Sequence, residues 1–212
     1  MKTLTDENKI EFFRFLNDER SIQEMENFIY SQTELQEQLD NLTYLNLIEL
    51  NFKDIYIKAK LTDLIKTRIV KTGQFETWRL IKKLNEFLTQ PEKIDHNLVD
   101  FYHLFYGVYQ ENGKRSYEYK FLGVLALNYF HWAETGYLKS LYGFNWELEY
   151  AKCQNDFNFY HKQLKGFATE ILFAIEHKEI EIFDNGTYKI STYLKNKYES
   201  NEVYKLNHPN SI

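Results

Sequence analysis

The sequence predicts a mostly α-helical fold, a multi-helix bundle around a buried central helix with one C-terminal β-hairpin. Its 212 residues include only 2 Pro and 8 Gly, which leaves little of the punctuation that a many-stranded sheet needs. Apolar residues recur at helical spacing along most of the chain. Residues 179–191 instead alternate around Asp184-Asn185-Gly186, and Asn-Gly between alternating segments is a strong hairpin signal.

Composition bounds the class of protein. With 43% hydrophobic and 27% charged residues, we expect a globular protein with one domain over residues 1–200 and a frayed tail at 201–212. The single cysteine, Cys153, excludes an internal disulfide and fits a reducing compartment. The charged N-terminus does not match a secretory signal, and the longest apolar run, 121–133, is shorter than the roughly 20 residues of a bilayer span. We therefore expect a cytoplasmic protein without a membrane segment.

The N-terminal helices carry clear start signals. Thr5 or Asp6 can cap the first helix. Ser21 and Glu24 match the capping box, in which the serine hydroxyl accepts an amide proton and the glutamate reaches back, so a second helix begins there. A short third helix is predicted over 33–39.

The next segments are read from apolar spacing. Apolar residues over 42–55 repeat at spacings of three and four, which favours a helix, although 45–52 also alternates as a strand would. Further helices are predicted over 54–70 and 75–88, and Pro91 ends the second of these.

The central helix is placed at 116–142, because 121–133 is apolar on nearly every face and must be surrounded by other helices. A helix capped by Asp95 precedes it. A long helix over 145–177 follows, with an interruption expected near 155–156.

Charge is distributed unevenly along the chain. Residues 1–54 contain 12 acidic and 5 basic residues, a net charge of −7, whereas residues 55–94 contain 9 basic and 4 acidic residues, a net of +5. An acidic face can attract and orient a basic partner. Alternatively, the acidic helices simply neutralise the basic pair of helices beside them.

Two surfaces follow from this charge pattern. The first is a protein-binding surface in the acidic third, for which the candidate contacts are Tyr30, Glu34, Glu37, Asp40 and Tyr44. The second is a nucleic-acid surface in the 55–94 helix pair, where cations grip phosphates and an indole stacks on a base. Its candidates are Arg68, Trp78, Arg79, Lys82 and Lys83. An overall acidic chain, with a pI of about 5.7, makes nucleic acid the weaker alternative.

Motifs of common enzymes and metal sites are missing from the sequence, including His-Glu-x-x-His, Cys-x-x-Cys, phosphate loops and the Gly-x-Ser-x-Gly elbow. We therefore expect no cofactor and no metal. Asn128, His131 and Thr135 share one face of the predicted central helix as buried polar candidates. They can either line an enzyme site, with His131 as proton acceptor, or satisfy hydrogen bonds between packed helices.

Residues 24–65 resemble a pattern in small bacterial immunity-type proteins linked to polymorphic toxin systems. The resemblance is carried by Glu24-Met-Glu-Asn-Phe-Ile-Tyr-Ser-Gln-Thr-Glu-Leu and by Tyr44-Leu-Asn-Leu-Ile-Glu-Leu-Asn-Phe-Lys. It implies a non-catalytic cytosolic protein that binds and blocks a cognate toxin. An acidic N-terminal third would suit a basic toxin.

Overall fold

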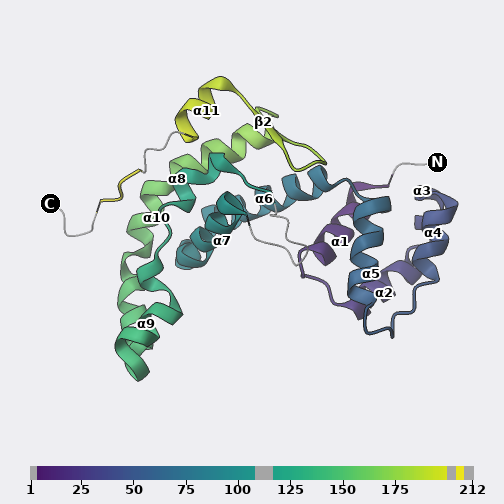
Figure 1. The fold of residues 1–212 in the computed structure, drawn as a ribbon, viewed down its shortest axis with the longest axis horizontal. Helices are drawn as coiled ribbons and strands as arrows, with labels where there is room; N and C mark the ends of the chain where they lie inside the picture. Colours follow the sequence, from purple (N-terminus) through teal and green to yellow (C-terminus); the bar gives the residue numbers. More distant parts are fainter. Residues whose placement is uncertain (1–3, 108–116, 200–203, 208–212) are drawn as a thin grey trace. The chain divides into compact units, whose positions relative to one another are not determined.

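The computed structural model describes residues 4–107, 117–199 and 204–207. These residues are mostly helical and end in a two-stranded antiparallel hairpin, as the sequence predicted (Figure 1). Contacts cluster in two compact units, Met1–Arg79 and Leu80–Ile212, where we expected one domain over residues 1–200. The boundary falls within one continuous helix, α6 (Thr72–Thr89).

The first unit, called unit 1 below, is built from short helices around its own core. They are α1 (Asp6–Leu16), α2 (Ile22–Ser31), α3 (Leu35–Gln38), α4 (Asn41–Ile48), α5 (Ile57–Leu64) with a π-helical turn at Ile65–Ile69, and the start of α6. The core buries Phe12, Met25, Leu35, Leu47 and Leu61 completely. Burial of these side chains supplies most of the driving force for folding this unit.

The predicted caps of α1 and α2 are confirmed. The Thr5 hydroxyl accepts a hydrogen bond from the backbone N–H of Asn8 at 3.3 Å. Ser21 and Glu24 form both bonds of the capping box, with the Ser21 hydroxyl accepting from the Glu24 N–H at 3.2 Å and the Glu24 carboxylate accepting from the Ser21 N–H at 2.7 Å. Local sequence therefore fixes where these helices begin.

The segment Asn41–Ile48 forms a helix, α4, and not a strand. Asp40 caps α4, because its carboxylate accepts hydrogen bonds from the backbone N–H of Thr43 at 2.9 Å and from the Thr43 hydroxyl at 2.6 Å. The helix ends at Ile48, and the residues up to Tyr56 are irregular, so the strand interpretation of 45–52 is wrong. The helix predicted over 54–70 begins only at Ile57.

The second unit, unit 2, contains the longest helix and the hairpin. Its elements are the rest of α6, a 3₁₀ turn at Pro91–Lys93, α7 (Ile94–Tyr106), α8 (Gly123–Ala126), α9 (Thr135–Tyr142), α10 (Trp146–Glu176), β1 (Ile180–Ile182), β2 (Tyr188–Ile190) and α11 (Thr192–Tyr198). Further 3₁₀ turns lie at Lys120–Leu122, His131–Ala133 and Gly143–Asn145. Its core includes Leu84, Phe87, Leu98, Phe101 and Leu164, all fully buried.

The central helix predicted at 116–142 is wrong. Residue 116 lies outside the described residues, and the rest forms two short helices, α8 and α9, separated and preceded by 3₁₀ turns. The Asn128 side chain donates a hydrogen bond back to the Val124 carbonyl at 2.8 Å, which satisfies an acceptor at the end of α8. A run that is apolar on every side has no hydrophobic periodicity that would favour one continuous helix. Tertiary packing therefore determines its conformation.

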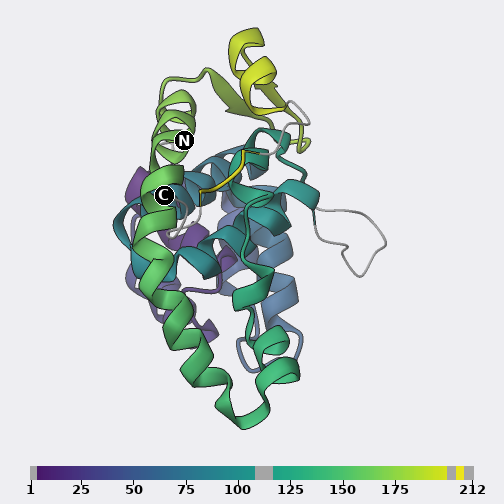
Figure 2. The same cartoon turned by 90° about the vertical axis from the view of Figure 1, so that its left-hand side faces the viewer.

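The long central helix is α10 instead, and it buries one face. Its bounds agree with the predicted 145–177, but the interruption expected near 155–156 is absent, since α10 is continuous. Buried residues recur at helical spacing along it, at Phe157, Tyr160, Leu164, Ala168 and Ile171. Helix α9 packs beside the N-terminal part of α10, as both views of the ribbon show (Figures 1 and 2).

The predicted hairpin is confirmed, with Ile180 paired to Ile190 and Ile182 to Tyr188. Gly186 in the turn has φ +82°, a conformation that favours glycine. The tail at 201–212 was predicted to be frayed, and within it the structure describes only 204–207. Asn207 there exchanges two hydrogen bonds with the Gln163 side chain of α10, at 2.8 and 3.1 Å, so this part of the tail is anchored.

Candidate functional site

Helix α4 presents an apolar face to solvent. It lies next to α2, α3 and α5 of unit 1 and buries Thr43 and Leu47 against them (Figure 1). On the opposite side Leu42 is 61% exposed and Leu45 is 47% exposed. An eight-residue helix that is apolar on both sides needs more cover than this unit provides. The outer side of α4 is therefore a candidate contact surface.

Tyr30 extends this apolar area at the C-terminal end of α4. Its hydroxyl donates a hydrogen bond to the Ile48 carbonyl at 3.2 Å, and its ring meets the Phe52 ring edge-on with centroids 6.0 Å apart. The side chain is held in place and still 57% exposed. Tyr44, by contrast, is half-buried against the core of unit 1, so only part of it faces solvent.

Carboxylates flank the two leucines at both ends of α4. Asp40 caps its N-terminus, and the hydrogen bonds from the Thr43 hydroxyl and N–H hold the pKa of this carboxyl below its usual range, so it is ionised at neutral pH. Glu34 and Glu37 are exposed in and beside α3, which packs on α4, and Glu49 follows the last turn. We define the α4 surface as Tyr30, Glu34, Glu37, Asp40, Leu42, Leu45 and Glu49.

A second acidic region of unit 1 is partly neutralised. A depression of about 550 Å³ between α1 and α2 is lined by Glu7, Glu11, Glu24 and Arg20, among others. The Arg20 guanidinium forms ion pairs with Glu11 at 2.8 Å and with Glu24 at 3.4 Å. Because Arg20 is paired with two of the three carboxylates, this depression has less unpaired negative charge than its composition suggests.

Comparisons with known proteins found no similarity: no family model matches the chain, and no curated protein or solved structure is significantly similar to it. Function must therefore be argued from the residues themselves. Within the described residues, no group of His, Cys, Asp or Glu is arranged to hold a metal ion. No helix in that part of the chain is both long and apolar enough to cross a bilayer.

The aromatic residue of the nucleic-acid alternative is occupied by packing. Trp78 is half-buried, with its ring centroid 5.6 Å from that of Phe13 and 6.3 Å from that of Phe75, on which it stacks. Arg68 is exposed at the end of the π-helical turn. An indole that already packs on two rings is poorly placed to stack on a base.

The cations of α6 also have partners. Each forms an ion pair with a carboxylate, which leaves less charge for phosphates. The pairs are Arg79 with Glu76, Lys82 with Glu86 and Lys83 with Asp100. These contacts do not favour the nucleic-acid alternative.

The three polar residues predicted to be buried on one face of the central helix are not fully buried and do not share a helix face. Asn128 lies in the turn after α8 and is half-buried, His131 begins a 3₁₀ turn and is exposed, and Thr135 is the exposed first residue of α9. The prediction was wrong because it assumed a continuous helix. The enzyme alternative around His131 therefore loses the shared face on which it was built.

The buried histidine of unit 2 is His161, which the sequence analysis did not single out. Its Nε2 lies 2.7 Å from the Phe87 carbonyl, and burial lowers its pKa, so the ring stays neutral at pH 7. Its place on the apolar stripe of α10 is the sequence signal that predicts burial. Cys153 is half-buried and burial raises the pKa of its thiol, which makes it unreactive.

Proposed function

We propose that this protein is a non-catalytic binding protein whose α4 surface docks on a basic protein partner, and that the partner is a toxin which it neutralises as an immunity protein. One observation carries the proposal: α4 leaves two neighbouring leucines in water between carboxylates at both of its ends. An apolar centre with a charged rim is the usual anatomy of a protein interface.

The apolar centre accounts for affinity. Leu42 and Leu45 lie on one face and are about half exposed, so covering them contributes on the order of 1 kcal/mol each. Tyr30 adds a ring that its own hydrogen bond holds in place, which lowers the entropy cost of binding. Tyrosine is enriched among residues that dominate binding energy.

The rim accounts for the choice of partner. Glu34, Glu37, Asp40 and Glu49 surround the leucines, and residues 1–54 carry a net charge of −7. Such a field accelerates encounter with a basic surface and disfavours acidic ones. The resemblance of residues 24–65 to immunity-type proteins supports a toxin as that partner, and these residues include most of α2 and all of α3 and α4 of the same unit.

The proposal is tested with the protein encoded immediately upstream of this gene. Growth of cells that express the upstream protein is compared with and without this chain, and the affinity of the pair is measured by calorimetry. We expect growth to be restored and the affinity to fall as salt rises, because rim charges are screened.

The matched variants are Leu45→Asp on α4 and Leu148→Asp on α10, both at exposed leucines. Leu45→Asp should abolish growth rescue and weaken binding at least tenfold, whereas Leu148→Asp should change neither. Equal binding by Leu45→Asp and the unmodified chain would contradict the assignment of the surface. Absence of any binding by the unmodified chain would contradict the toxin proposal for this neighbour.

A further inference from the structure

Helix α9 and the start of α10 form a two-helix arm of unit 2. The arm is residues 135–152, which include α9, the 3₁₀ turn Gly143–Asn145 and the first turns of α10. Within 135–152, all of which the structure describes, Leu138 alone is buried, and the first buried residue of α10 is Phe157. Short helices that bury so little are marginal by themselves. The arm would therefore gain stability from contacts that one copy of the chain does not provide.

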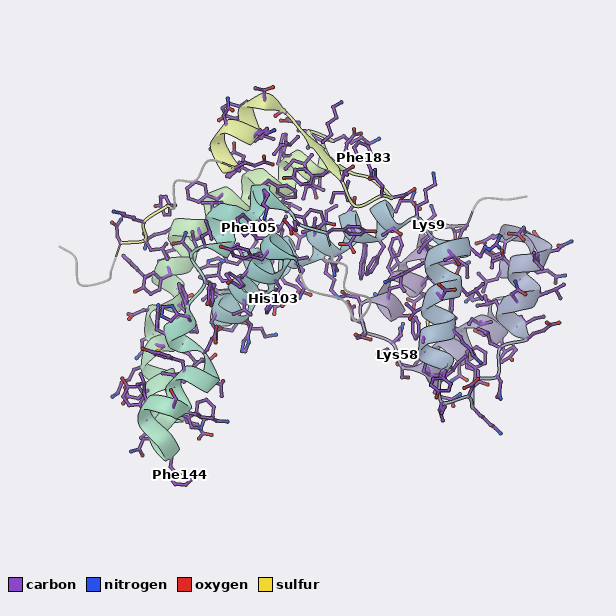
Figure 3. The ribbon with its side chains drawn as sticks, viewed as in Figure 1. Lys9, Lys58, His103, Phe105, Phe144 and Phe183 are labelled. Carbon is purple, nitrogen blue, oxygen red and sulfur yellow. The ribbon has the colours of Figure 1, made fainter. Side chains whose placement is uncertain are left out.

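Apolar side chains gather around the free end of the arm. Phe144, in the turn between the two helices, has an exposed fraction of 105%, and Figure 3 shows its side chain directed away from the ribbon. Other large side chains of the arm are between 42% and 66% exposed, namely Tyr137, Leu141, Tyr142 and Leu148. We call these five residues the arm patch. Together they expose on the order of 600 Å². A patch of this size is at the upper end of what a monomeric protein exposes, and such patches are often functional.

The two helices that carry the arm patch are joined by contacts of their own. The Lys139 ammonium of α9 lies 4.9 Å from the centroid of the Trp146 ring of α10. Within α10 the Lys152 ammonium pairs with the Glu149 carboxylate at 2.6 Å. A patch on helices that already contact each other loses less conformational entropy when a partner covers it.

The arm is electrically neutral, unlike the chain as a whole. Residues 135–152 contain two lysines and two glutamates, whereas the chain has a net charge of −5. Two copies of a neutral surface can meet without net repulsion, which two copies of the acidic α4 surface cannot. Helices that lie on anionic membranes are usually rich in lysine and arginine, and this arm has no excess of them. The charge therefore favours a second copy of the chain over a membrane.

We propose that the arm is the interface of a homodimer, in which the arm patches of two copies pack against each other. Two helices from each copy then form a four-helix bundle, and a two-fold axis relates the copies because each offers the same surface. Covering the arm patch on both copies buries on the order of 1,200 Å², the area at which stable specific interfaces begin.

Sedimentation equilibrium of the full chain between about 1 and 200 µM tests the dimer, and we expect a Kd of about 10 µM or tighter. Phe144→Asp and Leu148→Asp should each weaken self-association at least tenfold, because a two-fold interface contains each changed side chain twice. Ile55→Asp, at an 86% exposed residue of unit 1, should leave it unchanged. The arm patch and the α4 surface are independent, so Leu148→Asp should weaken the dimer without changing binding at α4.

Thermal unfolding at the lowest concentration serves as the folding control. Phe144 is fully exposed within one copy, so Phe144→Asp should unfold at the same temperature as the unmodified monomer. A chain that stays monomeric at every concentration overturns the proposal, as does an equally tight dimer of the folded Phe144→Asp variant. Binding of a monomer to phosphatidylcholine vesicles, lost in Phe144→Asp, would overturn it in favour of a lipid surface.

Discussion

The α4 surface of unit 1 and a cavity of about 470 Å³ in unit 2, lined by Asp95, Asp100 and Glu134 among others, are both acidic, yet they place apolar atoms and carboxylates in opposite ways. On α4 the leucines project to solvent and the carboxylates lie at the ends of the helix. In the cavity the carboxylates line the walls, and one oxygen of Asp95 is buried. Negative charge alone therefore does not identify a partner. The exposed apolar face of α4 has the anatomy of a protein interface, whereas two carboxylates of the cavity already have partners, Asp95 in the Tyr150 hydroxyl and Asp100 in the Lys83 ammonium.

The largest expected effect separates the two sides of α4. Leu47 is fully buried, so Leu47→Ala should lower the free energy of unfolding by about 2–5 kcal/mol. Leu45→Ala should lower it by less than about 0.5 kcal/mol, because the side chain is half exposed already. Urea denaturation measures both. Similar losses at the two positions would mean that Leu45 is part of the core and not of a contact surface.

The next effect concerns the hydroxyl that holds Asp95. Tyr150→Phe removes the donor to Asp95 Oδ2 and should cost about 1–3 kcal/mol of stability. Tyr30→Phe removes a hydroxyl from an exposed side chain, where water replaces the partner, and should cost less than about 0.5 kcal/mol. Equal losses of stability in the two variants would show that the hydrogen bond of the Tyr150 hydroxyl is as exposed to water as that of the Tyr30 hydroxyl.

The same tyrosine predicts an alkaline limit. Burial, followed by the hydrogen bond to Asp95, raises the pKa of Tyr150 to about 12. Because the folded state holds the proton more tightly, this stabilisation is complete below the unfolded pKa of about 10 and is lost as pH rises toward 12. Burial also raises the pKa of Tyr188 and Tyr198.

Urea denaturation at pH 9, 10 and 11 measures whether stability falls as pH rises. The unmodified chain should lose stability over this range, and Tyr150→Phe should lose less, because one group that titrates on unfolding is gone. A steeper loss in the variant would contradict the direction of this pKa shift.

The smallest effect compares two caps. Ser21 takes part in both bonds of a capping box, whereas Ser191 caps α11 through one longer bond, from the Leu194 N–H at 3.4 Å. Ser21→Ala should cost about 1 kcal/mol, and Ser191→Ala about half as much. Thermal unfolding of the two variants measures both losses of stability. A larger loss for Ser191→Ala than for Ser21→Ala would contradict this prediction.

Elements with local signals were predictable from the sequence. The capping box at Ser21, the length of α10 and the hairpin around Gly186 each depend on residues close in the chain. The run at 121–133 was not predictable, because residues that are apolar on all sides give no direction to pack. Its path depends on partners distant in the sequence, such as the ring of Phe105, which lies 3.1 Å from where a Cβ on Gly123 would be.

The candidate sites were predicted in part. Tyr30, Asp40 and the acidic residues around them were proposed from composition, whereas Leu42 and Leu45 were used only as evidence for a helix and not as contact residues. The missed signal is that Thr43 and Leu47, four residues apart, form the inner side of α4, so Leu42 and Leu45 lie outside it. Asp95 was predicted to cap α7, but it is the second residue of that helix and lines the cavity of unit 2.

Methyl cross-saturation NMR tests the central claim most directly. The chain, labelled at its leucine methyl groups, is mixed with the protein encoded upstream, and transfer across the interface is recorded. We predict loss of signal at Leu42 and Leu45 and none at Leu148, although Leu148 is more exposed than either. Transfer to Leu148 with α4 unaffected would contradict the account.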